Sequence, residues 1–291
     1  MSTEEQKRYA KEYYKKNVDK IRHRQRLSSE HAKYMNNNCK IIAECGCNHQ
    51  GDINIAKDLI KQAYLCEADY IKFQKRDINS HPEWDRPYNS KNSFGETYKE
   101  HRQFLEFTIE QHKELKEYCE EIGIGYACSV WDIQSAKDII SLDLDYIKVP
   151  SAKNNDYDLL NYIYNNYDKQ VHLSLGMTTR ADREELYIRI PRSRTVLYWC
   201  TSDYPAKFKD LFLLEIPKID ERFNVGYSGH HNGIAVDIVA YMLGVKWIER
   251  HFTLDRTLKG TDHAASLEPM GLQKLCRDIK AVKQTLTFKN D

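Results

Sequence analysis

The chain has 291 residues, 41% of them hydrophobic, with 44 Lys and Arg against 43 Asp and Glu and a formal net charge of +1. This balance gives no global attraction to nucleic acid or to a membrane surface, so any binding of anions has to be local. No apolar run approaches the roughly 18–20 residues of a membrane span, and the polar opening MSTEEQKRYA does not resemble a secretory signal, so we predict a cytoplasmic protein.

Residues 1–37 differ from the rest of the chain, because they are polar, rich in Lys, Arg and Tyr, and free of Gly and Pro. We predict a short helical N-terminal extension here, ending at the run of asparagines 36–38. Its basic excess raises the alternative of nucleic-acid binding. We favour a solvated arm that packs on a neighbouring subunit or on the main domain, because charge runs are usually solvated faces. The predicted domains are therefore 1–37 and 38–291.

From residue 40 onward, short apolar runs alternate with segments of helical periodicity. The predicted strands are residues 40–44, 69–74, 123–129, 145–149, 170–175, 195–200, 224–228 and 246–252. Between them, apolar residues recur at helical spacing, as in 108–122 and 132–143. Eight strands joined by helical crossovers predict an α/β fold of the (β/α)8 TIM-barrel type. No G-x-G-x-x-G follows the first strand, which argues against a dinucleotide-binding sheet.

Polar and charged residues stand where these strands end. Side chains two apart share a face of a strand, so Lys72 and Gln74 point together, as do Glu249 and His251. Glu44, Ser129, Lys148, Ser174 and Ser228 close other strands, while Ser151 and His230 follow directly. The carboxyl ends of barrel strands meet at one rim, where barrel enzymes place their active sites.

Each of these residues alone has an ordinary structural explanation, because a single Lys is usually a surface cation and a single His a hydrogen-bonded core residue. Together they indicate a site. Burying Lys72 and Lys148 without an anion would cost several kcal/mol each, of the order found for unpaired buried charges. Ammonium groups and hydroxyls suit a phosphate. Two histidines, His230 and His251, could hold one exchangeable divalent metal and leave positions open for substrate.

Several motifs extend this pattern along most of the chain. They are IIAECGCNHQGD at 41–52, DYIKFQ at 69–74, IKVPS at 147–151, LSLGM at 173–177, WCTSDYP at 199–205, GYSGHH at 226–231 and IERHFTLDRTLKGTDHAASLE at 248–268. In this order and spacing the chain resembles the sialic acid synthase (N-acetylneuraminate synthase) family from about residue 40 to 285. The resemblance implies a (β/α)8 barrel that condenses phosphoenolpyruvate (PEP) with an aldose, an N-acyl hexosamine or related sugar. The product would be a sialic-acid-like 2-keto-3-deoxy sugar acid, formed with release of phosphate.

The resemblance also implies roles for individual residues. Catalytic positions are matched by Glu44, Lys72 and Lys148, and the metal-binding histidines by His230 and His251. Substrate-binding positions are matched by Asn48, Gln74, Ser129, Ser151, Asn155, Ser174, Tyr204, Ser228 and Asp262, of which Asn48 and Asn155 are expected to serve only in positioning. The expected cofactor is a divalent metal, with Mn²⁺ first and Mg²⁺ or Co²⁺ as alternatives. The resemblance also predicts a homodimer, and no membrane partner.

Three departures from the family pattern concern the metal site, the last loop and the sugar acceptor. Gly229 stands where the family has an acidic residue, and Thr261 stands where it has a proline. We also expect no C-terminal antifreeze-like domain after the last helix, which in the family reaches the acceptor site of the partner subunit. The residues expected to bind PEP match the family pattern, whereas the part of the pattern that would hold the acceptor is incomplete, so we expect a different acceptor sugar.

Two alternatives remain open. A PEP-condensing barrel acting on a phosphorylated sugar would need further basic residues near the sugar positions, and the sequence shows no such cluster there. A non-catalytic scaffold or sugar-binding barrel would fit the departures just described. The retained charged set, Glu44 with the two lysines and two histidines, argues against the scaffold.

Overall fold

The computed structural model describes residues 38–80, 82–88 and 90–287, together with the isolated positions 4, 7, 11 and 15. The chain divides into two units, one of residues 39–279 and one of residues 1–38 with 280–291. The predicted arm, residues 1–37, lies outside the described residues apart from those four positions, so its structure stays a prediction. Within the described residues, the helices are all too short or too polar to cross a membrane.

Eight parallel strands close into a barrel in chain order. They are β1 (Lys40–Glu44), β2 (Tyr70–Lys75), β3 (Gly125–Val130), β4 (Tyr146–Val149), β5 (Gln170–Ser174), β6 (Thr195–Cys200), β7 (Asn224–Gly229) and β8 (Trp247–His251). Every strand begins and ends within two residues of its predicted range. The predicted (β/α)8 barrel is therefore confirmed.

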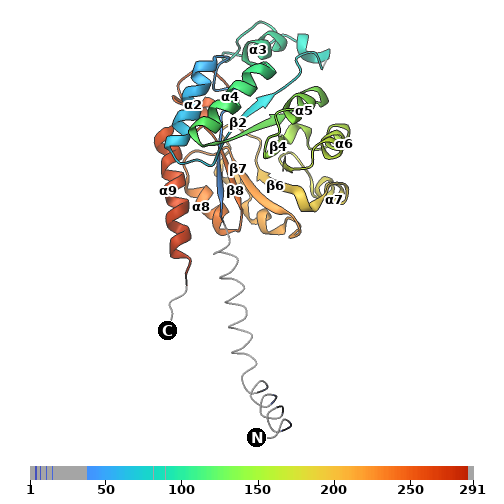
Figure 1. The fold of residues 1–291 in the computed structure, drawn as a ribbon, viewed down its shortest axis with the longest axis vertical. Helices are drawn as coiled ribbons and strands as arrows, with labels where there is room; N and C mark the ends of the chain where they lie inside the picture. Colours follow the sequence, from blue (N-terminus) through green and yellow to red (C-terminus); the bar gives the residue numbers. More distant parts are fainter. Residues whose placement is uncertain are drawn as a thin grey trace. The chain divides into compact units, whose positions relative to one another are not determined.

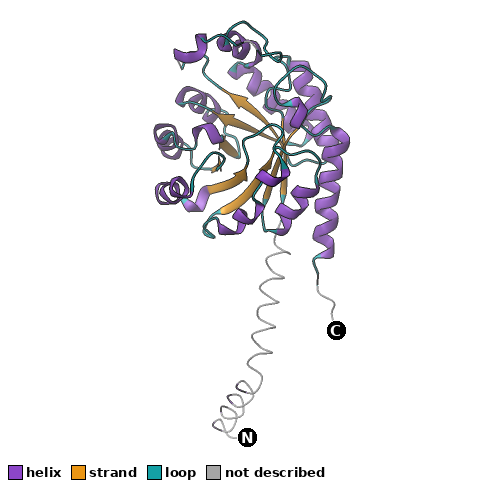
Figure 2. Ribbon diagram, turned by 180° about the vertical axis from the view of Figure 1, so that it is seen from behind, coloured by secondary structure: helices purple, strands orange, loops and turns teal. Residues whose placement is uncertain are grey.

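Helices surround the strands on the outside (Figures 1 and 2). They are α2 (Ile53–Leu65), α3 (Tyr98–Leu105), α4 (Ile109–Ile122), α5 (Ile133–Ile140), α6 (Tyr157–Asn166), α7 (Arg180–Arg189), α8 (Ala235–Met242) and α9 (Pro269–Thr285). Between β6 and β7 the connection contains two 3₁₀ turns, η4 (Phe208–Asp210) and η5 (Leu213–Lys218).

Local sequence explains where these helices begin and end, as α4 illustrates. Thr108 accepts a hydrogen bond from the backbone N–H of Gln111, whose side chain accepts in return from Thr108 N–H, and this capping box starts the helix. Gly123 ends it with φ of 88°, a left-handed conformation that glycine adopts without steric cost. The apolar stripe between them, with Leu115 and Cys119, is buried.

The interior of the barrel is packed with side chains one layer below the rim. Ile42, Ala127, Tyr146, Val196 and Tyr198 form a buried cluster, against which Tyr70 and Trp247 pack. Gly226 makes room for one of the rings, since a Cβ there would lie 2.6 Å from Cε1 of Tyr198. Most members of this layer lie two residues before a polar residue at the rim, on the same inward face. The apolar layer therefore fills the barrel interior directly below the polar groups at the rim.

The long connection after β2, residues 76–97, contains a 3₁₀ turn, η1 (Pro82–Asp85), and leads into α3. The α3 helix was not among the helical patterns predicted from the sequence. It begins with a capping box between Thr97 and Glu100. An isolated β-bridge between Pro87 and Thr97 folds the connection back on itself. The loop therefore has structure of its own at the rim.

Candidate active site

A cavity of about 290 Å³ opens at the carboxyl ends of the strands. All eight strands contribute at least one residue to its wall. The lining residues are Glu44, Lys72, Gln74, Ser129, Trp131, Lys148, Pro150, Ser151, Ala152, Ser174, Met177, Cys200, Ser202, Tyr204, Ser228, His230, Glu249 and His251. This wall includes most of the predicted site residues, so the structure brings them together as the sequence predicted.

Two lysines and two glutamates form a buried cluster on the cavity floor, which we call the lysine–glutamate cluster. Lys72 contacts the Glu44 carboxylate, lies 3.6 Å from Glu249 Oε2, and donates a hydrogen bond of 2.7 Å to Ser129 Oγ. Lys148 pairs with Glu249, which also accepts a hydrogen bond of 3.1 Å from Ser228. Each lysine therefore has a carboxylate partner within the protein, which supplies the anion that its burial requires.

Burial and charge act against each other in this cluster. Burial lowers the pKa of Lys148 below its ordinary value, and the Glu249 carboxylate offsets only part of that effect. Burial also lowers the pKa of Lys72, but the carboxylates of Glu249 and Glu44 outweigh burial and raise this pKa above its ordinary value. For Glu249 itself, burial favours the neutral acid, yet the two lysines hold its pKa below the usual range. Lys72 and Glu249 are therefore held in their charged forms.

A chain of hydrogen bonds runs from Glu44 towards the loop after β2. Gln74 Nε2 donates to Glu44 Oε1 over 2.7 Å, and its Oε1 accepts from Arg76 over 2.5 Å. Arg76 also bonds Glu106 and lies 3.9 Å above the Trp131 ring. These contacts fix the amide orientation of Gln74 and hold one oxygen of Glu44 in place.

The two histidines predicted to bind metal face each other, with ring centroids 5.4 Å apart. His230 Nδ1 lies 2.6 Å from the Thr201 carbonyl oxygen, which can only accept, so Nδ1 carries the proton and Nε2 is left with a free lone pair. Burial lowers the pKa of His230 to about 3, which keeps the ring neutral. His251 Nδ1 is buried without a hydrogen-bond partner, 3.6 Å from Asp262 Oδ2.

These features fit an ion held by two imidazole nitrogens. Neutral rings with a free nitrogen are the form of histidine that binds metals. Across residues 38–80, 82–88 and 90–287, this site included, no group of three or more His, Cys, Asp or Glu side chains is arranged to hold a metal ion. The geometry therefore suits an exchangeable ion and not a closed structural site.

Three predicted residues lie outside the cavity wall. Asn48 is buried and donates to the Phe252 carbonyl over 2.8 Å and to Ser266 Oγ over 2.9 Å, which ties the loop after β1 to the loop after β8. This placement agrees with a positioning role. Asp262 reaches the rim beside His251.

The prediction for Asn155 is corrected by the structure. Asn155 is exposed and lines a separate surface hollow with Tyr157 and Asp182. The 3₁₀ turn η2 (Ser151–Lys153) rotates the chain so that the preceding residue, Asn154, faces the barrel. Asn154 is buried and donates to the backbone oxygens of Ser174 and Gly176, each over 3.0 Å. Positioning of the strand β5 end therefore falls to Asn154.

Sequence reasoning did not assign seven of the lining residues, namely Trp131, Pro150, Ala152, Met177, Cys200, Ser202 and Glu249. The two-residue period of WIERH had already placed Glu249 on the face of His251, and this signal was sufficient to find it. Cys200 Sγ lies 3.3 Å from Ser151 Oγ. Gly176 leaves the space for this group, because a Cβ there would lie 2.4 Å from Ser202 Oγ.

Comparison with known proteins agrees with this geometry. The model of the NeuB family matches residues 59–291. N-acetylneuraminate-9-phosphate synthase of Homo sapiens is 39% identical over 256 residues, which cover 85% of this chain and 71% of the relative. N,N'-diacetyllegionaminic acid synthase of Campylobacter jejuni is 34% identical over 257 residues, covering 84% and 77%.

Among solved structures, the N-acetylneuraminic acid (sialic acid) synthetase of Leptospira borgpetersenii superposes with a TM-score of 0.77 at 28% identity. The match covers 88% of this chain and 87% of that one. Fold, site and sequence similarity therefore agree, and the chain belongs to the NeuB family of enzymes that make sialic-acid-like sugars.

Proposed function

We propose that the chain condenses PEP with the aldehyde of an open-chain aldose, forming a 2-keto-3-deoxy sugar acid and releasing phosphate. The observation that supports this most directly is the single cavity that holds the lysine–glutamate cluster and the facing histidines together. The relatives point the same way, since their names describe synthases of N-acetylneuraminate 9-phosphate and diacetyllegionaminic acid. A homodimer and a cytoplasmic location stay predictions.

In this proposal the ammonium groups of Lys72 and Lys148 bind the carboxylate and phosphate of PEP. Hydroxyls from the surrounding strand ends donate further hydrogen bonds; they belong to Ser129, Ser151, Ser174 and Ser228. Because both lysines already contact carboxylates, PEP has to share or displace these contacts. Holding two reactants in reactive geometry can contribute about 7–11 kcal/mol toward lowering the barrier.

The facing histidines, His230 and His251, would hold the divalent metal, for which Mn²⁺ is the first expectation and Mg²⁺ or Co²⁺ the alternatives. A metal bound there supplies a Lewis acid that polarises the acceptor aldehyde. Tyr204, whose ring lies 4.1 Å from that of His230, covers this side of the cavity and helps to exclude water.

C3 of PEP attacks the aldehyde carbon and forms the new carbon–carbon bond, while the aldehyde oxygen takes up a proton. Water adds to the positive C2, and the C2–O bond then breaks, which releases phosphate and leaves the ketone. Glu44, fixed by Gln74 and Lys72, is placed to stabilise the charge at C2 or to take the proton from the water.

The test is phosphate release from PEP across a panel of aldoses, with the products identified by mass. We expect activity with Mn²⁺, loss of activity with EDTA, and recovery on adding metal back. Glu44→Gln should lower kcat by about 10²–10⁴-fold, the range for removing a general acid or base. Glu184→Gln, on the exposed face of α7, is the matched control and should stay active. Full turnover by Glu44→Gln, or indifference to EDTA, contradicts the corresponding role.

A further inference from the structure

A buried polar group lies behind β7 and β8, on the side of the barrel wall that faces α8. It consists of Arg250, Asp237 and His231, each at most 1% exposed, and we call it the arginine bracket. Arg250 pairs with Asp237 and lies 3.2 Å from His231 Nε2. Because a guanidinium can only donate, Nε2 accepts, and Nδ1 donates to the Tyr227 hydroxyl over 3.2 Å. None of these side chains lines the active-site cavity.

The two-residue period of β8 explains why Arg250 points away from the cavity. Its neighbours Glu249 and His251 line the cavity, so Arg250 faces outward, toward α8. Outward-facing residues on other strands, such as Ile147 and Leu173, are apolar and fully buried. Apolar side chains therefore suffice to pack the helices on the wall, and a buried ion pair is often no more stabilising than apolar residues of the same size. Packing alone does not account for a charged group at this place.

The backbone groups that Arg250 binds indicate what it does. Where the chain leaves β7, Arg250 donates to the carbonyl oxygen of His231 over 2.5 Å and to that of Gly233 over 2.7 Å. Within the sheet, Arg250 is also the register partner of Gly229. The main chain is therefore held to β8 on both sides of His230, by strand pairing before it and by the guanidinium after it.

The second of the facing histidines is attached to the same bracket. His251 follows Arg250 directly in β8, as His231 follows His230 in the loop after β7. A shift of the guanidinium therefore moves the two ring-bearing segments relative to each other. The ring centroids are 5.4 Å apart, and among the residues that the structure describes no third His, Cys, Asp or Glu completes a metal-binding group with them. With only two protein nitrogens, the affinity for a metal depends directly on how well their separation is fixed.

Gly229, one of the departures from the family pattern, belongs to this bracket and not to the cavity. A Cβ at Gly229 would lie 2.9 Å from His231 Cε1 and 3.0 Å from Arg250 Cδ, so a side chain at this position would point at the bracket. An acidic residue there would therefore meet Arg250. In this chain the imidazole of His231 fills the space that the glycine leaves, and Asp237 of α8 supplies the carboxylate. The charge is relocated, and Arg250 keeps an acidic partner.

We infer that Arg250, held in place by Asp237, is a positioning residue for the metal site and sets the separation of the His230 and His251 rings. This inference rests on the proposed function, in which these rings hold a divalent metal, and names the group that fixes their spacing. Removing the guanidinium frees two backbone carbonyls and lets the loop after β7 shift, so metal binding weakens although both ligands remain. Groups outside the ligand shell typically change metal affinity by about 10- to 100-fold.

The experiment measures Mn²⁺ binding to the intact chain from the electron paramagnetic resonance signal of free Mn²⁺, at a temperature where every variant is folded. The test variant is Arg250→Met/Asp237→Asn, which removes both charges at nearly constant volume and leaves no unpaired buried ion. We expect its Kd for Mn²⁺ to rise by about 10- to 100-fold. Its Kd for PEP, measured by calorimetry without metal, should stay at the wild-type value, because the lysine–glutamate cluster is untouched. Arg180→Gln/Glu184→Gln, which removes an exposed ion pair of α7, is the matched control and should change neither constant.

The possible results separate this inference from the proposed function. A wild-type Kd for Mn²⁺ in the double variant overturns the positioning role. Equal weakening of Mn²⁺ and PEP binding also overturns it, because a general loosening of the barrel then explains both. If His230→Gln binds Mn²⁺ as wild type does, the proposed metal role of the histidines fails, and the inference fails with it. If the double variant does not fold, Arg250→Lys replaces it. Its ammonium keeps the pair with Asp237 but cannot hold both carbonyls, so the Kd for Mn²⁺ should still rise, and an unchanged value overturns the inference.

Discussion

Replacing Glu249 by Gln tests the lysine–glutamate cluster directly. The substitution keeps the size of the side chain and its contact with Ser228 but removes a carboxylate that two buried lysines share. Breaking a buried ion pair by removing one partner costs about 3–5 kcal/mol. In a domain of this size, about 150–250 residues, each kcal/mol lowers Tm by about 2–4 °C. We therefore expect Tm to fall by about 10 °C or somewhat more.

Thermal unfolding followed by circular dichroism measures this shift, with Glu184→Gln on the exposed face of α7 as control. The control removes one carboxylate from a surface pair and should change stability by less than about 1 kcal/mol. PEP should stabilise Glu249→Gln more than wild type, because its negative charge replaces the one removed. If Glu249→Gln unfolds at the wild-type temperature, the lysines do not depend on this carboxylate, and the charge argument fails.

Three further outcomes follow from the structure. Gly226→Ala should destabilise the chain by about 1–3 kcal/mol in denaturant titration, because its methyl group would meet the Tyr198 ring at 2.6 Å; wild-type stability would contradict that packing. Asn48→Ala, which removes two buried hydrogen bonds, should lower the free energy of unfolding by about 1–3 kcal/mol and raise KM. An unchanged midpoint of unfolding would contradict this. Burial lowers the pKa of His112 from 6.5 to about 3, so between these pH values the unfolded chain binds a proton that the folded chain does not. The free energy of unfolding should therefore fall as the pH drops below about 6.5, by up to about 1.4 kcal/mol per pH unit. In His112→Gln this pH dependence should be shallower, as measured by unfolding from pH 7.5 to 5.

The barrel was predictable because its strands are short apolar runs between helices of clear periodicity. The same period of two places Lys72 with Gln74, and Glu249 with His251, which was enough to gather the rim residues. The α3 helix escaped prediction because its apolar residues are few, and its start depends on the Thr97 capping box within a long polar connection.

Two features of the site could not be predicted from the sequence, each for its own physical reason. Strand residues follow a fixed alternation, whereas a single turn decides which loop residue faces inward, so η2 selects Asn154 over Asn155. The ion pairs that balance the buried lysines could also not be predicted from the sequence, because their partners are distant in the chain. Lys148 and Glu249 are 101 positions apart in sequence, and only the closure of the barrel makes them partners.

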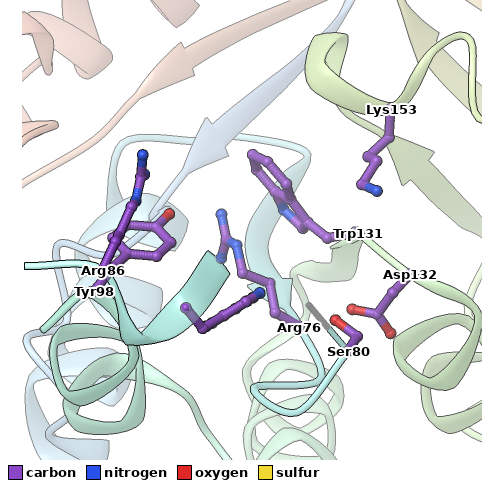
Figure 3. Close-up of a pocket in the computed structure, with 8 residues that line it drawn as sticks. Arg76, Ser80, Arg86, Tyr98, Trp131, Asp132 and Lys153 are labelled. Atoms are coloured by element: carbon purple, nitrogen blue, oxygen red, sulfur yellow. The ribbon is translucent and has the colours of Figure 1, made fainter. Parts of the chain in front are cut away.

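The division between strands and loops also separates the two halves of the proposed reaction. The groups assigned to PEP stand on strand ends, where the closed barrel fixes their spacing and the apolar floor supports them. A neighbouring hollow (Figure 3) is lined by residues of the connections after β2, β3 and β4, among them Arg76, Trp131 and Lys153, and barrel enzymes vary such connections without changing the strands. Family membership therefore constrains the PEP chemistry far more than the acceptor. The acceptor therefore has to be argued from the loop residues, because the strand ends carry the groups assigned to PEP.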